Sequence, residues 1–271
     1  MLQFIRRLKS AYSFYNFFHQ DQLDQNKRLF KKWNIKRAPW KSLQHEFFKK
    51  IEDPFTPPLD TKDAKEVLPH DDRFKELPDN HKNALLQWSE KGYSILGKFF
   101  NENEVDIINQ EVERLIDRGE ADWHYSRPRI MFAIHKSDKI RNILKNHSLH
   151  AILEMLLGRE IQLFQSINFK VGSQQAAHSD SVHMTTFPKG FLIAAWIALE
   201  DINEDNGPLF YYPGSHQLPY VMNQNYDHGG NKWLISKNAN AAYEKRIEKL
   251  IEDKGLVKER FYAKKGDVLI W

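Results

Sequence analysis

Residues 191–199 read Phe191-Leu192-Ile193-Ala194-Ala195-Trp196-Ile197-Ala198-Leu199, a run made entirely of apolar side chains. Such a run is typical of a buried strand at the centre of a sheet. Around it the chain alternates between short apolar segments and turns. Strands are predicted over 161–170, 209–212 and 268–271, and turns at Asn206-Gly207-Pro208 and Pro213-Gly214-Ser215-His216. The second half of the chain is therefore expected to be a set of antiparallel strands.

Upstream of these strands the pattern is mainly helical. Asn101 and Glu104 have the spacing of a capping box, and apolar residues follow at helical intervals until Gly119, a predicted helix stop. Further helices are predicted over 84–91, 137–157 and 236–254, with a short strand over 92–96. Helices first and antiparallel strands later predict an α+β protein, built on a jelly-roll (cupin-like) barrel with flanking N-terminal helices.

Residues 1–80 predict a helical, basic N-terminal extension to a domain over 81–271. Helices are expected over 2–18, 22–33 and 42–51, before a proline-rich linker near 53–58. Residues 1–50 carry 12 Lys and Arg against 3 Asp and Glu, a net charge of +9, which leaves −5 for the remainder of a chain of net charge +4. Such a segment can contact nucleic acid or an anionic membrane, or pack on the core through its aromatic side chains. We expect the packed arrangement.

Composition excludes several classes of site. The 271-residue chain has no Cys, which removes disulfides, Cys-zinc sites, iron–sulfur clusters and thiol nucleophiles. The first residues lack the apolar region of a signal peptide, and no apolar run reaches the roughly 20 residues of a membrane span. We therefore expect a cytoplasmic protein without a transmembrane segment. Nothing in the sequence predicts its oligomeric state.

His178 and Asp180 carry the clearest chemical signal. On an extended segment, side chains two residues apart point to the same side, so this pair presents an imidazole and a carboxylate together. These are two of the three protein ligands in the 2-His-1-carboxylate facial triad, which leaves positions on Fe(II) open for co-substrate and oxygen. The spacing predicts part of a metal site, with a second His expected far downstream.

An ordered set of motifs resembles the phytanoyl-CoA dioxygenase family. The motifs are Gln165-x-x-Asn168, His178-x-Asp180, Trp196, Asn206-Gly207-Pro208-Leu209, Pro213-Gly214-Ser215-His216 and Gly266-Asp267-Val268-Leu269. A lone His-x-Asp triplet is a weak signal, but the whole set in this order is specific. The resemblance covers about residues 92–271 and leaves residues 1–80 outside. It implies a double-stranded β-helix core and an Fe(II)- and 2-oxoglutarate-dependent oxygenase similar to the ectoine hydroxylases.

Carried over residue by residue, the resemblance implies that His178 and Asp180 bind Fe(II). Trp196 would line the 2-oxoglutarate site, and Gln165 and Asn168 match positions that contact this co-substrate. The implied reaction uses O2 to hydroxylate a small organic substrate while 2-oxoglutarate is decarboxylated to succinate. Related halogenases have a small residue at the position of Asp180, so an Asp here favours hydroxylation.

The family pattern continues from Gly-Asp-Val-Leu-Ile-Trp into a strand that holds the distal His, followed by an Arg that pairs with 2-oxoglutarate. Neither residue follows in this sequence, so we expect it to be truncated after Trp271. His216 is interpreted as structural and His183 as a loop residue beside the substrate. If no distal His existed, His216 and His228 would be the remaining candidates for a third ligand.

Three alternatives stay open. A degenerate jelly-roll binding protein would keep the fold without catalysis, and a cupin-type metal enzyme would act without 2-oxoglutarate. Nucleic-acid demethylation is suggested by the basic N-terminus. It is opposed by the net charge of −5 over the remainder of the chain, because a phosphate-binding groove needs a basic face.

Overall fold

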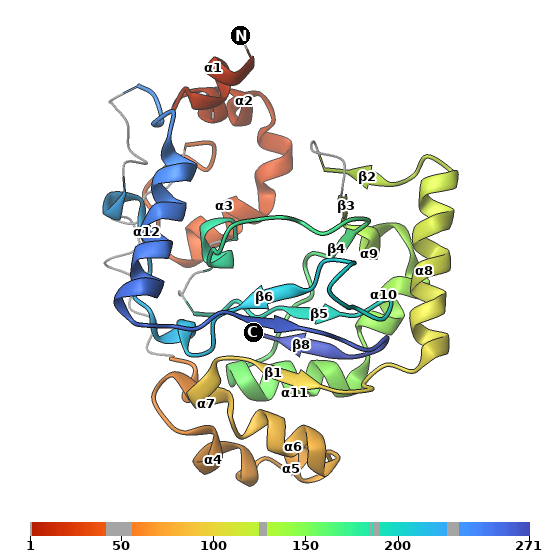
Figure 1. The fold of residues 1–271 in the computed structure, drawn as a ribbon. Coiled ribbons are helices and arrows are strands. Elements are labelled where there is room, and N and C mark those ends of the chain that lie inside the picture. The colour runs from red at the N-terminus through yellow and green to blue at the C-terminus, as the bar shows by residue number, and fades with distance from the viewer. Residues whose placement is uncertain (1, 42–55, 125–128, 185, 187–189, 227–232) are drawn as a thin grey trace. The chain divides into compact units, whose positions relative to one another are not determined.

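The computed structural model describes residues 2–41, 56–124, 129–184, 186, 190–226 and 233–271 (Figure 1). The α-helices are α1 (Leu2–Arg7), α2 (Ala11–Phe18), α3 (Asp24–Lys32), α4 (Ala64–Val67), α5 (Asp72–Lys75), α6 (Asp79–Leu85), α7 (Trp88–Lys91), α8 (Glu102–Asp117), α9 (Ala133–Lys136), α10 (Asp138–Leu144), α11 (His147–Leu157) and α12 (Ala239–Asp253). The strands are β1 (Ser94–Leu96), β2 (Asp122–Trp123), β3 (Arg129–Met131), β4 (Ile167–Phe169), β5 (Ala195–Ile197), β6 (Leu209–Tyr211), β7 (Glu259–Phe261) and β8 (Val268–Ile270).

The chain forms two compact units. One comprises Met1–Phe55 with Pro219–Leu250, and the other comprises Thr56–Leu218 with Ile251–Trp271. The sequence predicts a domain border near residue 80. The two compact units divide the chain at other positions, and the predicted border stays a prediction. All five residues of the predicted site belong to the second unit.

The apolar run forms the strand β5 in a sheet of order β1-β8-β5, with antiparallel pairing throughout. The sequence predicts a central strand over 191–199, but the regular strand is only Ala195–Ile197. It lies at the edge of this three-stranded sheet, and β8 occupies the centre between β1 and β5. The prediction was wrong in this respect. All three residues of β8 are buried, whereas those of β5 are half-buried, which is why β8 suits the central place.

Two further groups of strands are also antiparallel. One has the order β2-β3-β4, and the other pairs β6 with β7. Helices combined with antiparallel strands confirm the predicted α+β class. Closure of these strands into a jelly-roll barrel stays a prediction.

The turn before β8 explains the Gly266-Asp267 motif. Gly266 has a positive φ of 89°, and a Cβ added there would lie 2.2 Å from the carbonyl oxygen of Phe100. Only glycine combines this conformation with so close a backbone approach. The Asp267 carboxylate accepts hydrogen bonds from the backbone N–H groups of Lys98 (2.7 Å) and Lys264 (2.8 Å). The motif therefore fixes where β8 begins.

The predicted capping box is present at the start of α8. The Asn101 side chain accepts from the N–H of Glu104, and the Glu104 carboxylate accepts from the N–H of Asn101, each at 3.0 Å. Further along the helix, Glu111 is buried and accepts from the Ser137 hydroxyl at 2.8 Å. This contact connects α8 to the start of α10.

The single helix predicted over 137–157 is wrong, because the structure has separate helices α10 and α11 there. Ser137 caps α10 by accepting from the N–H of Ile140, and Asn146 caps α11 by accepting from the N–H groups of Ser148 and Leu149. The cap at Asn146 therefore interrupts a segment that apolar spacing alone presents as continuous. The predicted end at Gly158 is confirmed, since its φ of 68° is left-handed.

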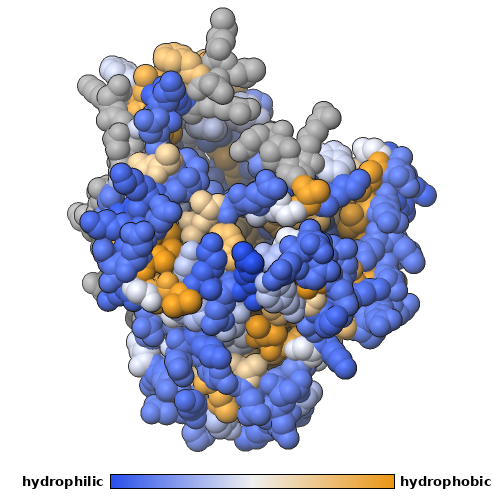
Figure 2. Space-filling view, in the orientation of Figure 1, coloured by the Kyte–Doolittle hydropathy of each residue, from blue (hydrophilic) through white to orange (hydrophobic). Residues whose placement is uncertain are grey.

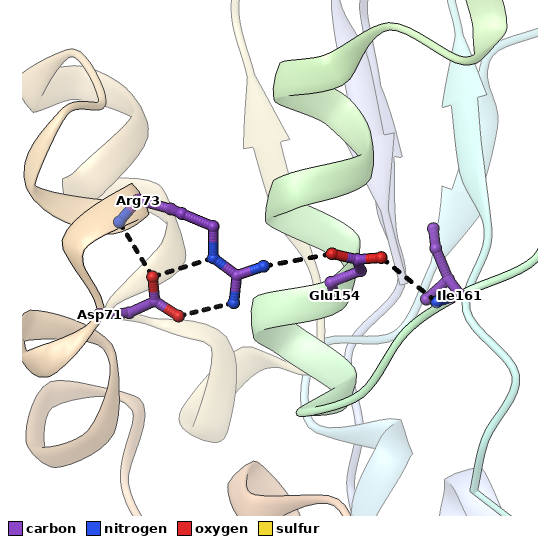
Figure 3. A network of polar contacts seen from close by, with 4 residues as sticks. All are labelled: Asp71, Arg73, Glu154 and Ile161. Carbon is purple, nitrogen blue, oxygen red and sulfur yellow. Dashed lines mark hydrogen bonds and ion pairs between the residues drawn. The ribbon is translucent and has the colours of Figure 1, made fainter.

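One face of the β1-β8-β5 sheet packs on helices, and α11 runs along it in Figure 1. Leu96, Val268 and Ile270 from the sheet form a buried cluster with Ile152 of α11. A polar network at the edge of this layer is drawn in Figure 3. There Arg73 pairs with Asp71 at 2.7 Å and with Glu154 of α11 at 3.2 Å, so it ties α11 to the segment that begins α5.

The aromatic side chains of α2 differ from the expectation that they pack on the core. Tyr12, Phe14 and Phe18 are 59%, 68% and 64% exposed, and no residue of this helix is buried. Figure 2 shows hydrophilic residues over most of the visible face, with hydrophobic residues in small groups. Among the described residues, no helix is both long enough and apolar enough to cross a membrane. The predicted helix over 42–51 lies outside the described residues.

Candidate functional site

His178 and Asp180 lie in the segment after β4, where the chain leaves an extended conformation. Ser179 is extended, with φ −95° and ψ 132°, and Asp180 begins a short 3-10 turn, Asp180–Val182. His178 Nε2 lies 3.5 Å from Asp180 Oδ1. The structure therefore brings the predicted pair together, although Asp180 begins a turn instead of continuing a strand.

A backbone carbonyl orients His178 for a ligand role. Its Nδ1 lies 2.8 Å from the carbonyl oxygen of Ala176, and donation there leaves Nε2 on the side of Asp180, where it can donate to the carboxylate when protonated and bind a metal ion when neutral. Two donors that each bind one ion at about 2.1 Å can lie no more than about 4.2 Å apart. The observed 3.5 Å satisfies this limit. An imidazole nitrogen and a carboxylate oxygen are donors that suit Fe(II), so the pair fits the predicted metal.

The two side chains shift each other's pKa in opposite directions. The hydrogen bond with Asp180 raises the pKa of His178 against the effect of burial. Burial alone would raise the pKa of Asp180, but hydrogen bonds from His178 and Trp271 hold that pKa below its ordinary value. Asp180 is therefore ionised at neutral pH, which is the form that binds a metal ion.

Trp196 and Trp271 lie on one face of the β1-β8-β5 sheet. Trp196 pairs with Leu269, and Trp271 extends β8 by exchanging two backbone hydrogen bonds with Ala194 (3.0 and 3.1 Å). Because side chains two apart share a face, Leu269, Trp271 and Trp196 all project to the same side. Trp271 reaches Asp180 from this face, with its indole Nε1 donating to Oδ2 at 3.0 Å. This places Trp196 on the face that meets Asp180, where it also contacts Phe261 at 5.8 Å between ring centroids.

Asn168 has an unsatisfied polar atom. It lies in β4 opposite Ile130, and within the described part of the chain its Oδ1 is buried without a hydrogen-bond partner. A buried amide oxygen without a partner is rare in proteins and indicates a position for a ligand or water donor. Gln165 is half-buried in the segment that leads to β4. Its contact with the co-substrate stays a prediction.

Arg129 is a cation of this region that no sequence pattern revealed. It lies in β3 opposite Phe169, and its guanidinium stands 5.5 Å from the centroid of that ring. Its Nε is buried and has no partner among the described residues. Its positive charge opposes protonation of both His178 and His183, although the net pKa of His178 is raised. In the sequence, Arg129 stands only as a charged residue beside apolar Ile130. Nothing in that pattern predicts that it lies near His178 and His183.

The other histidines differ in their surroundings. The His183 ring lies edge-on to that of His178 with centroids 5.4 Å apart, and burial lowers the pKa of His183. His216 Nε2 lies 3.2 Å from the carbonyl oxygen of Ser89, and its ring stands where a Cβ on Gly92 would be. These contacts agree with its interpretation as structural. His228 lies outside the described residues.

Within the described ranges, no group of three His, Cys, Asp or Glu residues is arranged to hold a metal ion. The structure therefore presents two adjacent donors, a nearby guanidinium and an indole that holds the carboxylate.

The family profile described as phytanoyl-CoA dioxygenase (PhyH) matches residues 88–271, well over half of the chain. The chain belongs to the phytanoyl-CoA dioxygenase family. The predicted resemblance is thereby confirmed. Among curated proteins, the phytanoyl-CoA dioxygenase domain-containing protein 1 of Bos taurus is 33% identical over 95 residues, 32% of each chain. The protein of that name from Danio rerio is 31% identical over 80 residues, 30% of this chain and 26% of its own. These matches span about a third of the relatives' length or less.

Two solved structures share a similar fold with this chain. The non-haem α-ketoglutarate-dependent carbocyclase SnoK from nogalamycin biosynthesis has a TM-score of 0.53 and 18% identity, over 73% of this chain and 75% of its own. EctD from S. alaskensis, solved with 2-oxoglutarate and 5-hydroxyectoine, has a TM-score of 0.52 and 18% identity, over 78% of this chain and 72% of its own. At this identity the likeness shows the fold alone.

Proposed function

We propose that this member of the phytanoyl-CoA dioxygenase family is a non-haem Fe(II)- and 2-oxoglutarate-dependent dioxygenase that hydroxylates a small organic substrate. One observation carries the proposal: His178 Nε2 and Asp180 Oδ1 lie 3.5 Å apart, and Nδ1 is engaged by the Ala176 carbonyl. Bound Fe(II) would supply the redox chemistry that couples substrate oxidation to 2-oxoglutarate decarboxylation. One atom of O2 enters succinate, the other enters the new hydroxyl group, and CO2 leaves.

We further propose that four side chains bind the co-substrate. Arg129 is half-buried and offers a positive charge for a carboxylate, and its buried Nε lacks a partner in the described residues. The Asn168 amide oxygen can accept from a ligand or a bound water for the same reason. Trp196 supplies an apolar wall on the face of the sheet that Trp271 shares. With Gln165, these residues would orient 2-oxoglutarate beside His178 and Asp180.

The test uses isotope-labelled oxygen, because the natural substrate need not be known. The protein is loaded with Fe(II) without oxygen, then given 2-oxoglutarate and ¹⁸O2, and succinate is analysed by mass spectrometry. We expect succinate that carries one ¹⁸O atom, formed slowly even without substrate. A cupin-type enzyme independent of 2-oxoglutarate and a binding protein without turnover would both leave 2-oxoglutarate intact and form no labelled succinate.

The chain supplies a matched control for the two ligands. His70 and Asp72 form a second His-x-Asp pair, but both side chains are exposed and Asp72 pairs with Lys75. His178→Ala or Asp180→Ala should abolish labelled succinate, whereas His70→Ala and Asp72→Ala should leave it unchanged. Turnover at the wild-type rate in either site variant would refute the metal assignment.

A further inference from the structure

We infer that Trp271 is a positioning residue that holds Asp180 in a one-oxygen ligand geometry. This inference rests on the proposed function, since it concerns the same metal site. The indole Nε1 of Trp271 donates to Asp180 Oδ2 at 3.0 Å. The other oxygen, Oδ1, is the one that lies 3.5 Å from His178 Nε2. The two carboxylate oxygens thus have different partners: Trp271 for Oδ2 and His178 for Oδ1.

The sheet delivers the indole to this position. Trp271 exchanges two backbone hydrogen bonds with Ala194, so the extended conformation of β8 continues to this residue. The start of β8 is fixed by Gly266, whose conformation and approach to Phe100 exclude a side chain, and by the Asp267 carboxylate. From there the alternation of side chains carries Trp271 to the same face as Leu269 and Trp196. The indole is therefore placed by the backbone of a strand and not by a loose loop.

An indole suits this task for a chemical reason. Its N–H is a donor and it has no acceptor, so it can engage one carboxylate oxygen without competing for the metal ion. The terminal torsion of an Asp side chain is broad, so an unrestrained carboxylate turns freely and can offer either oxygen or both. With Oδ2 engaged, Asp180 occupies a single coordination position and leaves the remaining ones for co-substrate and oxygen.

Trp271→Phe tests the inference because it keeps the ring and removes the donor. Trp123→Phe is the matched control: Trp123 is 39% exposed, close to the 38% of Trp271, and lies in β2. Mn(II) affinity is measured by calorimetry without oxygen, and the visible absorption of bound Co(II) reports the coordination geometry. Loss of a partner that orients a metal ligand typically weakens affinity about 10- to 100-fold. We expect about a tenfold loss and an altered Co(II) spectrum for Trp271→Phe, and neither change for the control.

The outcomes separate this inference from the proposed function. If the wild-type protein binds no Mn(II), the metal assignment fails and the positioning role fails with it. If the wild-type protein binds Mn(II) and His178→Ala does not, but Trp271→Phe binds with unchanged affinity and spectrum, only the role of Trp271 is refuted.

A second measurement covers the case in which Trp271→Phe does not fold. In wild-type protein with ¹⁵N-labelled indole, the Nε1–H resonance of Trp271 should be shifted by Asp180→Ala. An unshifted resonance would show that the hydrogen bond is absent and would overturn the inference.

Discussion

Glu111 is the buried carboxylate on which the junction of α8 and α10 depends, and Glu111→Gln tests that junction. The carboxylate accepts from the Ser137 hydroxyl at 2.8 Å and from Arg114 Nε at 3.0 Å, and Lys139 Nζ lies 3.0 Å away. The Ser137 hydroxyl and the Lys139 ammonium are the main causes that lower the pKa of Glu111 to about 2. Gln preserves the volume of the side chain but removes the negative charge that interacts with Ser137, Arg114 and Lys139.

The free energy at stake follows from this pKa. The ordinary value is 4.5 and the folded value is about 2, a difference that corresponds to roughly 3 kcal/mol at about 1.4 kcal/mol per factor of ten. The Lys139 side chain is 69% exposed, so solvent weakens its contribution. Because Gln can still accept from Ser137, we expect Glu111→Gln to lower the free energy of unfolding by about 2 kcal/mol at pH 7, or about 4–8 °C in melting temperature.

The pH dependence has a definite sign. A carboxylate whose folded pKa lies below its unfolded pKa stabilises the fold above the unfolded value and loses this effect as pH falls through the folded value. The difference between wild type and Glu111→Gln should therefore be constant above about pH 5.5 and shrink by about half near pH 3.5. Urea unfolding followed by circular dichroism at both pH values measures it, with exposed Glu113→Gln on the same helix as control. A difference under about 0.5 kcal/mol at pH 7, or one that does not change with pH, would refute the reasoning.

Three further predictions concern other parts of the chain. Gly266→Ala should destabilise the protein by about 2–4 kcal/mol in urea unfolding, because Ala strains the φ of 89° and meets the Phe100 carbonyl; a loss below about 1 kcal/mol would contradict this. Asn101→Ala should cost about 1 kcal/mol in the same assay through loss of the capping box, and Asn101→Asp, which can still accept from Glu104, should restore most of it. Arg129→Met should raise the KM for 2-oxoglutarate at least tenfold in the succinate assay and leave Mn(II) affinity within about twofold, because a charge-assisted hydrogen bond contributes about 1.5–3 kcal/mol; an unchanged KM would remove Arg129 from the co-substrate site.

The features of the fold that could be predicted from sequence are those with a local cause. The capping box of Asn101 and Glu104 and the helix stop at Gly158 are each determined by a few neighbouring residues. Two predictions were wrong: a central strand over 191–199 and a single helix over 137–157. Long-range packing decided the first, and an internal helix cap decided the second. Burial of β8 against both neighbours displaced β5 from the centre of its sheet, and Asn146 restarted the helix.

The residues of the candidate site also differ in whether the sequence could predict them. His178 and Asp180 could be predicted because their spacing brings them together in any extended segment, and the structure has them 3.5 Å apart. Arg129 and Trp271 could not, since Arg129 is close to this pair only through the pairing of β3 with β4, and Trp271 only through the pairing of β8 with β5. No periodicity in the sequence encodes these contacts between distant segments.

In the proposed site, the charges of Fe(II), Asp180 and 2-oxoglutarate do not cancel, and we propose that Arg129 supplies the missing positive charge. Fe(II) brings two positive charges, whereas Asp180 and a dianionic 2-oxoglutarate together bring three negative ones. Burial of an unbalanced charge is costly, so a site that holds all three needs at least one further cation. Arg129 is a half-buried cation whose buried Nε has no partner in the described residues and whose charge acts on His178. This is why its loss should weaken binding of the anionic co-substrate much more than binding of the metal ion, whereas loss of His178 should abolish both.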